Sequence, residues 1–436
     1  MPTPGDKVKI ITSSETIEGI LVPSPKEDTI IIKMSNGYNL GVFKKEVKEI
    51  VVLEKSKPKE TKSESIQQIR TNNNLPKILI LHTGGTIASK VDYRTGGVTS
   101  SFSPKDLINL FPELSPIARI ESELISQMWS DDLRFANLTK IAQKIEEKLT
   151  LDKEIKGLII GMGTDNLAVA SAALSFMVEI SPVPIIVVGS QRSSDRGSSD
   201  AGMNLICAAE FIAQSDFTGV GICMHGNDED LNCVILPAAK TYKLHSSRRD
   251  AFKAVNSEPI AKVNYNTRKV EFLTSKYVSS KDKNKLLIKP KLEEKVGLLK
   301  IHLNMFPEQF SFFKGYKGLI IEGTGLGHAP GQAPNPETEI HKKIYPAIKE
   351  VIDSGCIVVM TTQCLFGGVN LNVYDKGRDL LNLGIIPGKD MLANTALVKL
   401  AWLLANYPKD KVKELISSNL RGEINERISY EEDFLK

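Results

Sequence analysis

The chain has 436 residues, more than one ordinary domain holds, so two or three domains are expected. Its 41% hydrophobic and 25% charged residues are typical of a soluble globular protein, and a net charge of +4 does not by itself indicate a nucleic-acid partner. No apolar run reaches the roughly 18 residues of a membrane span, and the N-terminus does not resemble a secretory signal, so we expect a cytoplasmic protein without a membrane partner.

Residues 1–53 contain short apolar segments separated by turn residues, which predicts a small all-β barrel. The expected strands are Lys7–Ile11, Ile17–Val22, Thr29–Met34, Leu40–Phe43 and Val47–Val52. Asn36-Gly37 is a strong two-residue hairpin signal. Residues 54–75 are charged and polar with almost no core-forming side chains, which predicts a solvated linker.

From residue 76 onward, apolar runs alternate with loops of small residues and with helical segments. The apolar runs are Lys77–Leu81, Gly157–Ile160, Pro184–Val188, Gly318–Ile321 and Cys356–Met360. This pattern predicts an α/β fold with parallel sheets covered on both faces, where ligands bind at the carboxyl ends of the strands. A charged, proline-containing stretch at 275–295 divides two α/β lobes, which we place at 76–285 and 286–436.

Two of the loops carry candidate chemistry. The first, 83–89, sets two glycines between hydroxyl residues, which fits a nucleophilic threonine, Thr86, as well as a phosphate-binding or structural turn. The second contains Thr164 and Asp165, which on their own fit ordinary helix capping. A hydroxyl nucleophile needs a base, and a lysine that can give up its proton could supply it. The spacing does not choose between Lys240 and Lys243.

Three motifs occur in the order typical of the type I/II L-asparaginase family, which the chain resembles: LHTGGTIAS (81–89), GTD (163–165) and YKLHSSRRDAF (242–252). Two further stretches, GTGLG (323–327) and TALVKLAWLLAN (395–406), resemble the C-terminal lobe of that family. The resemblance implies a two-lobed α/β fold and hydrolysis of a side-chain amide.

The resemblance also implies the catalytic residues. Thr86 matches the usual nucleophile of the family, and Tyr93 matches the tyrosine that helps to activate it. Thr164, Asp165 and Lys243 match a second threonine–aspartate–lysine set.

No metal is expected, because the six histidines are dispersed and none shows the HExxH spacing. The cysteines lack CxxC spacing, and we expect them to be reduced.

Substrate binding is implied in the same way. Ser130 matches the serine that holds the substrate α-carboxylate, Asp131 lies beside it, and Asp165 would also contact the α-amino group. The chain departs from the family pattern His-Gly-Thr-Asp-Thr, because Met162 and Asn166 occupy the outer positions. The hydrogen bonds of this loop are therefore expected to differ from those of the family.

In the N-terminal region, the segments GDKVKI (5–10), ETIEGILVPS (15–24) and IIIKMSNGYNLGVF (30–43) resemble the extra domain of the GatD family, the glutaminase subunits of archaeal-type glutamyl-tRNA(Gln) amidotransferases. That resemblance implies glutamine as the substrate and a GatE-type partner that binds Glu-tRNA(Gln) and uses ATP and Mg, with no cofactor in this chain. It also implies a homodimer within a heterotetramer. A movable lid is expected at Lys90–Ser101, with Gly96-Gly97 as its hinge.

Two other functions remain open at this stage. One is a stand-alone cytoplasmic L-asparaginase with an accessory barrel. The other is a non-catalytic scaffold whose barrel binds RNA. The retention of both threonines, the aspartate and the lysine argues against a dead site. The mixed charges of residues 1–53 also lack the basic patch with aromatic residues that RNA binding favours.

Overall fold

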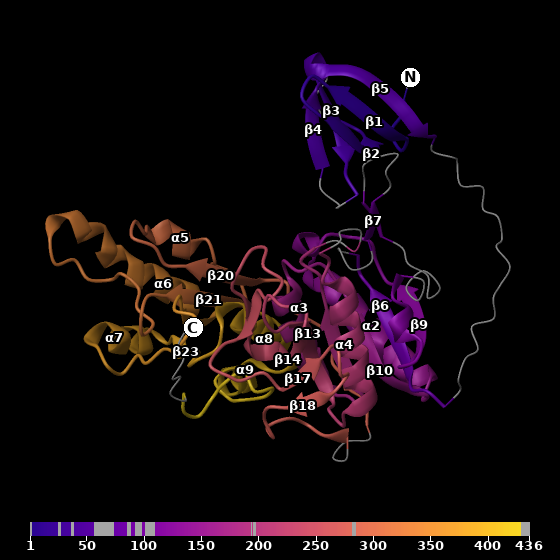
Figure 1. Ribbon diagram of the computed structural model, residues 1–436. Helices are drawn as coiled ribbons and strands as arrows, with labels where there is room; N and C mark the ends of the chain where they lie inside the picture. Colours follow the sequence, from indigo (N-terminus) through magenta and orange to yellow (C-terminus); the bar gives the residue numbers. More distant parts are fainter. Residues whose placement is uncertain are drawn as a thin grey trace.

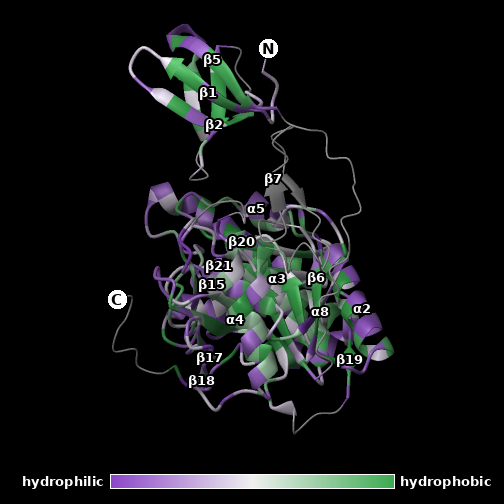
Figure 2. Ribbon diagram, turned by 45° about the vertical axis from the view of Figure 1, so that its right-hand side comes forward, coloured by the Kyte–Doolittle hydropathy of each residue, from purple (hydrophilic) through white to green (hydrophobic). Residues whose placement is uncertain are grey.

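The computed structural model describes residues 2–24, 28–35, 39–55, 74–84, 89–91, 98–100, 110–192, 194, 198–280 and 285–428. A small N-terminal sheet domain stands apart from a larger body in which helices surround two sheets (Figure 1). The strands of the larger body carry its most hydrophobic residues, and the polar residues lie toward its outside (Figure 2). The predicted fold class, two α/β lobes preceded by an all-β domain, is confirmed.

The N-terminal domain is a five-stranded antiparallel sheet in the order β4-β3-β2-β1-β5. Its strands are β1 (Lys7–Thr12), β2 (Thr16–Val22), β3 (Thr29–Lys33), β4 (Asn39–Phe43) and β5 (Val47–Glu54), with the 3-10 turn η1 (Lys44–Glu46) before β5. Alternate side chains of β1 and β2 turn inward, so that Val8, Ile10 and Ile17 form a core with Ile32 and Val42. The expected hairpin at Asn36-Gly37 lies outside the described residues.

The first lobe is built on an eight-stranded sheet in the order β18-β17-β14-β13-β12-β10-β6-β9. Five neighbouring strands run parallel to one another: β9, β6, β10, β12 and β13. The next three, β14, β17 and β18, are each antiparallel to the strand before them in the sheet. The strand bounds are β6 (Lys77–His82), β9 (Arg119–Leu124), β10 (Ile155–Gly161), β12 (Pro184–Val188), β13 (Gly219–His225), β14 (Asn232–Pro237), β17 (Ala261–Asn264) and β18 (Val270–Phe272).

Helices cover both faces of this sheet, which explains why its central strands are mostly apolar on both sides. Leu79 and Leu81 pack in one core with helices α2 (Phe135–Leu151) and α3 (Leu167–Met177). The neighbouring residues of the strand, Ile78 and Ile80, pack on the other side with α4 (Ala201–Gln214). Side chains of a strand alternate between faces, so each face needs its own apolar set.

The second lobe has a four-stranded parallel sheet in the order β20-β21-β22-β23. The strands are β20 (Val296–Lys300), β21 (Gly318–Gly323), β22 (Ile357–Thr362) and β23 (Ile386–Pro387). The accompanying helices are α5 (Pro307–Ser311), α6 (Ile344–Asp353), α7 (Asp375–Leu383), α8 (Ala393–Asn406) and α9 (Lys409–Ile416), with the 3-10 helices η3 (Pro112–Leu114) in the first lobe and η7 (Pro336–Lys343) in the second.

Helix α8 joins the two lobes into one body. Its Trp402 stacks on Phe176 of α3, with ring centroids 6.0 Å apart, and both belong to a hydrophobic core that contains residues of both lobes. Lys399 of α8 forms a 2.6 Å ion pair with Glu423, and both side chains are fully buried. The short strand β19 (Leu287–Ile288) pairs with β11 (Val178–Ile180), so the segment just before β20 also packs on the first lobe.

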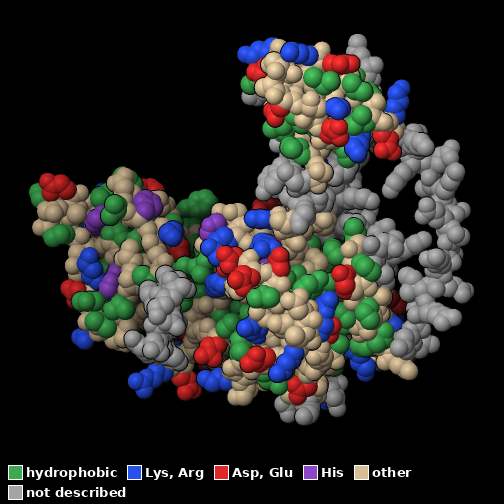
Figure 3. Space-filling model, in the orientation of Figure 1, with side chains coloured by type: hydrophobic (Ala, Val, Ile, Leu, Met, Phe, Trp, Pro, Cys, Tyr) green, Lys and Arg blue, Asp and Glu red, His purple; other side chains and the backbone are tan. Residues whose placement is uncertain are grey.

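Within the described residues, no helix is both long and apolar enough to cross a membrane. Figure 3 shows lysine, arginine, aspartate and glutamate side chains interspersed on the visible face of the N-terminal domain. That face therefore presents both signs of charge rather than a single basic patch.

Candidate active site

The candidate site lies at the carboxyl ends of β6, β10 and β12, which are neighbours in the parallel sheet. The loops after these strands begin with Thr83, Met162 and Gly189, respectively. Because parallel strands all end at the same edge, side chains that are far apart in the sequence meet there.

Ser130 shapes the loop after β10. It opens the 3-10 turn η4 (Ser130–Asp132) and is 4% exposed. Its Oγ accepts the backbone N–H groups of Asp165 at 3.1 Å and Asn166 at 3.3 Å, which leaves its own hydroxyl hydrogen free to donate. A Cβ on Gly163 would lie 2.8 Å from this Oγ, so only glycine lets the two segments approach so closely.

The unusual Asn166 of this loop has a clear structural function. Its side-chain Nδ2 donates to the backbone oxygen of Ser130 at 2.8 Å. Together with the two backbone bonds to Ser130 Oγ, this contact ties the start of α3 to η4.

Thr164, Asp165 and Lys243 come together at the start of α3. Lys243 Nζ donates to Thr164 Oγ1 at 3.0 Å and to Asp165 Oδ1 at 2.9 Å. The lysine side chain is 15% exposed and the aspartate 67% exposed. The cation is thus mostly enclosed beside the hydroxyl, while the carboxylate faces the solvent, from which a substrate would arrive.

A short hairpin places Lys243. Strand β15 (Thr241–Lys243) pairs with β16 (Phe252–Ala254), with Lys243 opposite the buried Phe252. The ammonium group lies 6.0 Å from the Phe252 ring centroid. The apolar ring supports the lysine stem while the charged end reaches Thr164.

The structure separates the two lysines that spacing alone leaves open. Lys240, three residues earlier, belongs to the 3-10 turn η5 (Ala238–Lys240) and is 1% exposed. It forms an ion pair with Asp390 of the second lobe, which is 3% exposed. Lys240 therefore holds the lobes together, and Lys243 is the lysine beside the hydroxyl.

Gln191, to which the sequence interpretation assigns no role, also contacts Thr164. The Thr164 hydroxyl donates to Gln191 Oε1 at 3.4 Å. The sequence feature that could have indicated Gln191 is its place in the loop after β12, which is expected at the carboxyl edge of the sheet. Nothing else in the sequence distinguishes it from a solvent-exposed glutamine.

Asp131 lies next to Ser130 in η4 with an exposed side chain. Across the described residues, no contact links it to Thr164 or Lys243. Thr86, Tyr93 and the expected hinge at Gly96-Gly97 lie outside the residues that the structure describes.

The start of the loop that carries Thr86 is described and well anchored. Thr83 donates to the Gly161 oxygen through its backbone N at 2.9 Å and through its Oγ1 at 3.2 Å. Gly84 has φ +99°, and a Cβ there would meet the Met128 oxygen at 2.5 Å. The glycine is therefore required both by its backbone conformation and by the close approach of the segment that precedes η4.

His82, the last residue of β6, is 1% exposed, and neither of its ring nitrogens has a hydrogen-bond partner in the described part of the chain. Burial lowers its pKa from 6.5 to about 4, so the ring is neutral at physiological pH. In the described residues, no group of three or more His, Cys, Asp or Glu side chains could hold a metal ion.

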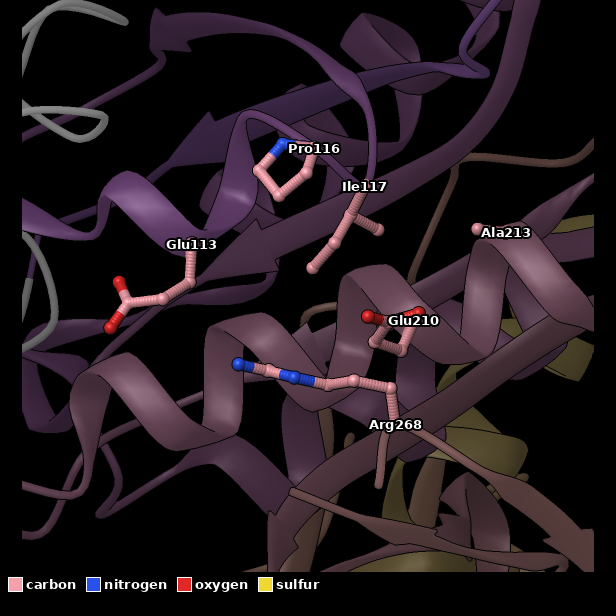
Figure 4. Close-up of a pocket in the computed structure, with 6 residues that line it drawn as sticks. All are labelled: Glu113, Pro116, Ile117, Glu210, Ala213 and Arg268. Carbon is pink, nitrogen blue, oxygen red and sulfur yellow. The ribbon is translucent and has the colours of Figure 1, made fainter. Parts of the chain in front are cut away.

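A separate surface cavity of about 460 Å³ lies beside the C-terminal half of α4, away from the loops at its N-terminal end (Figure 4). Arg268 extends between the carboxylates of Glu113 and Glu210 in that cavity. The lining residues are Glu113, Pro116, Ile117, Glu210, Ala213 and Arg268. None of them is a hydroxyl nucleophile, so this cavity does not offer the chemistry of the Thr164 site.

Three protein families match the chain in succession. Residues 3–53 match the GatD N-terminal domain, residues 77–277 the N-terminal asparaginase domain, and residues 295–415 the glutaminase/asparaginase C-terminal domain. Among solved structures, the chain is similar to the thermostable L-asparaginase from Thermococcus kodakarensis, with 29% identity and a TM-score of 0.69. It is also similar to L-asparaginase I from Vibrio cholerae, with 26% identity and a TM-score of 0.67. Each alignment covers 80% of this chain and 99% of the other.

Curated relatives match over nearly the whole length. The GatD-type glutamyl-tRNA(Gln) amidotransferase subunit of Methanococcus maripaludis is 43% identical, over 98% of this chain and 99% of the relative. The corresponding subunit of Pyrococcus furiosus is 42% identical, over 96% and 94%. That of Archaeoglobus fulgidus is 39% identical, over 98% and 96%. The chain therefore belongs to the GatD family of glutamyl-tRNA(Gln) amidotransferase subunits, whose catalytic body has the asparaginase fold.

Proposed function

We propose that this chain hydrolyses the side-chain amide of glutamine and supplies ammonia for the ATP-dependent conversion of Glu-tRNA(Gln) to Gln-tRNA(Gln). The observation that carries the proposal is the geometry at the start of α3, where Lys243 lies within 3.0 Å of both the Thr164 hydroxyl and the Asp165 carboxylate. A hydroxyl, a proton-handling amine and a carboxylate are the groups that amide hydrolysis through a threonine ester requires.

The reaction proceeds in two steps. Thr86 Oγ forms a bond to the carboxamide carbon, and backbone N–H groups of the glycine-rich loops stabilise the oxyanion. The hydroxyl proton of Thr86 passes to the amide nitrogen, and the C–N bond breaks as ammonia leaves. Water then hydrolyses the glutamyl ester and releases glutamate. Lys243 exchanges a proton with the Thr164 hydroxyl, and Asp165 contacts the substrate α-amino group. The hydroxyl hydrogen of Ser130 is available to the α-carboxylate.

The N-terminal domain favours the amidotransferase over a stand-alone L-asparaginase, because the two L-asparaginase structures described above align with only 80% of the chain. The curated relatives align with nearly all of it and are named as subunits of an amidotransferase. A GatE-type partner would bind Glu-tRNA(Gln) and use ATP and Mg, with two copies of this chain forming a homodimer within a heterotetramer. The complex would act in the cytoplasm.

Trapping the acyl-enzyme tests the chemistry. Denaturing the protein during glutamine turnover should preserve a glutamyl ester, and peptide mass spectrometry should locate it on Thr86 or Thr164. An adduct on neither threonine would contradict the proposal. Chelators should leave the hydrolysis unchanged, and hydrolysis that is lost on chelation and restored by zinc would indicate a different mechanism.

A further inference from the structure

Gln191 presents an unused hydrogen-bond donor beside Thr164, which contacts Lys243. Its Oε1 accepts the Thr164 hydroxyl, while its Nε2 is buried and has no partner in the structure as described. Buried amide nitrogens are almost always hydrogen-bonded in native proteins, because leaving the donor unpaired destabilises the fold. A donor left unpaired at the edge of a site is therefore an indication of a missing acceptor.

The orientation of the Gln191 amide follows from its neighbours. Lys243 donates to Thr164 Oγ1, so the hydroxyl hydrogen of Thr164 must point to another acceptor. Gln191 Oε1 is that acceptor. The carboxamide is planar, so Nε2 is then directed to the other side of the group, where no acceptor of the described residues lies within hydrogen-bond distance.

The backbone of Gln191 is held rigidly. Asp200, which precedes α4 and is fully buried, accepts the backbone N–H of Gln191 at 3.0 Å and that of Arg192 at 3.0 Å. Asn204 donates both to Asp200 Oδ2 at 3.1 Å and to the Gly189 oxygen at 3.0 Å. The backbone that carries the unpaired donor is therefore fixed before any ligand arrives.

The loop is also pressed against Thr164. A Cβ on Gly189 would lie 2.9 Å from Thr164 Cγ2 and 2.6 Å from Leu167 Cδ1. Only a glycine lets the loop approach this closely. The buried carboxylate, the asparagine and the glycine all serve to keep the Gln191 carboxamide at the Thr164 hydroxyl.

We propose that Gln191 is a substrate-contacting residue, whose Nε2 donates a hydrogen bond to the carbonyl oxygen of the substrate amide bound beside Thr164. The inference rests on the proposed amidohydrolase function and adds a residue to it. Because the carbonyl oxygen gains negative charge as the tetrahedral intermediate forms, this hydrogen bond strengthens in the transition state. Gln191 therefore acts mainly on kcat.

Two substitutions test the proposal. Gln191→Glu keeps an acceptor for Thr164 but replaces the donor with a charged oxygen, and Gln191→Met removes both groups at similar length. Both should reduce kcat for glutamine by about 100-fold, with a smaller change in KM, which is the effect of removing one donor to an oxyanion.

Stability separates this role from a purely structural one. Gln191→Met removes the unpaired Nε2 donor together with the long 3.4 Å acceptor contact to the Thr164 hydroxyl, so its Tm should stay close to that of the wild type. A matched control is Gln214→Met on α4, because Gln214 Nε2 is paired with Glu210 at 2.6 Å and the Arg268 oxygen at 2.8 Å. This control should keep its activity and lose some stability.

The outcomes are distinguishable. An active wild type whose Gln191→Met variant retains full kcat, or loses Tm and activity together, would refute the role of Gln191 and leave the proposed function standing. A wild type that releases no ammonia from glutamine or asparagine, even with its partner, would refute the proposed function and this inference with it. Thr164→Ala, expected to be inactive, shows that the assay reports on this site.

Discussion

Replacing Lys243 with arginine separates proton transfer from charge. Lys243 Nζ lies 3.0 Å from Thr164 Oγ1 and 2.9 Å from Asp165 Oδ1, so the group both contacts the hydroxyl and pairs with the carboxylate. Arginine keeps the positive charge but cannot lose a proton at physiological pH. If Lys243 handles a proton, Lys243→Arg should be nearly as inactive as Lys243→Ala.

The expected magnitudes for activity and stability differ widely. A positioned acid or base contributes roughly 100-fold to 10,000-fold to rate, which is about 3–5 kcal/mol of transition-state stabilisation. Asp165 is 67% exposed, so its ion pair with Lys243 contributes at most about 1 kcal/mol to folding. Lys243→Arg should therefore lose at least about 100-fold in activity, while its free energy of unfolding changes by less than about 1 kcal/mol.

The assay is steady-state ammonia release from glutamine, paired with denaturant unfolding of the same samples. Lys253→Arg is a matched control, because Lys253 lies on the opposite strand of the same hairpin and donates to the Gly226 oxygen at 2.8 Å instead of to Thr164. It should keep nearly full activity. Substantial glutaminase activity in Lys243→Arg would refute the assignment of proton transfer to this lysine.

Three further predictions concern stability and domain structure. The pKa of His82 is lowered to about 4, so below pH 6.5 the unfolded chain binds a proton that the native chain does not. Stability should fall by about 3 kcal/mol from pH 6.5 to pH 4, and His82→Met should remove this part of the pH dependence of urea unfolding. Lys240→Met should destabilise the protein by about 3–5 kcal/mol, because it leaves the buried Asp390 carboxylate without its cation. The double variant Lys240→Met/Asp390→Leu should recover most of that loss. Equal unfolding free energies for the single and double variants would contradict the pairing. Deletion of residues 1–53 should leave a cooperative thermal transition and ammonia release intact, and any loss of activity should be in the transfer of ammonia to Glu-tRNA. Aggregation of the truncated chain would show that the N-terminal domain belongs to the core fold.

The parallel sheets could be predicted from sequence because their strands contain continuous apolar runs that end in loops of small residues. Leu79 and Leu81 face one layer of helices while Ile78 and Ile80 face the other, and this two-sided burial produces continuous apolar runs. The edge at which ligand-binding loops gather follows from the parallel topology alone.

Other features depend on contacts across long sequence separations. Lys240 and Lys243 both lie near Thr241, and the sequence contains nothing that separates a buried ion pair with Asp390 from a contact with Thr164. The turn η5 interrupts the strand alternation just before Lys243, which is why the two lysines take different directions. Gln191 owes its position to Asp200, and a pattern of loop residues does not reveal that contact.

The most direct test of the central claim compares ammonia release from glutamine by this chain alone with release in the presence of its GatE-type partner and Glu-tRNA. A protein that delivers ammonia to a partner should be slow alone, and the partner with charged tRNA should raise the rate by about tenfold or more, which corresponds to about 1.4 kcal/mol of coupling. Full-speed hydrolysis by the isolated chain, with no response to partner or tRNA, would contradict the account and indicate a stand-alone asparaginase.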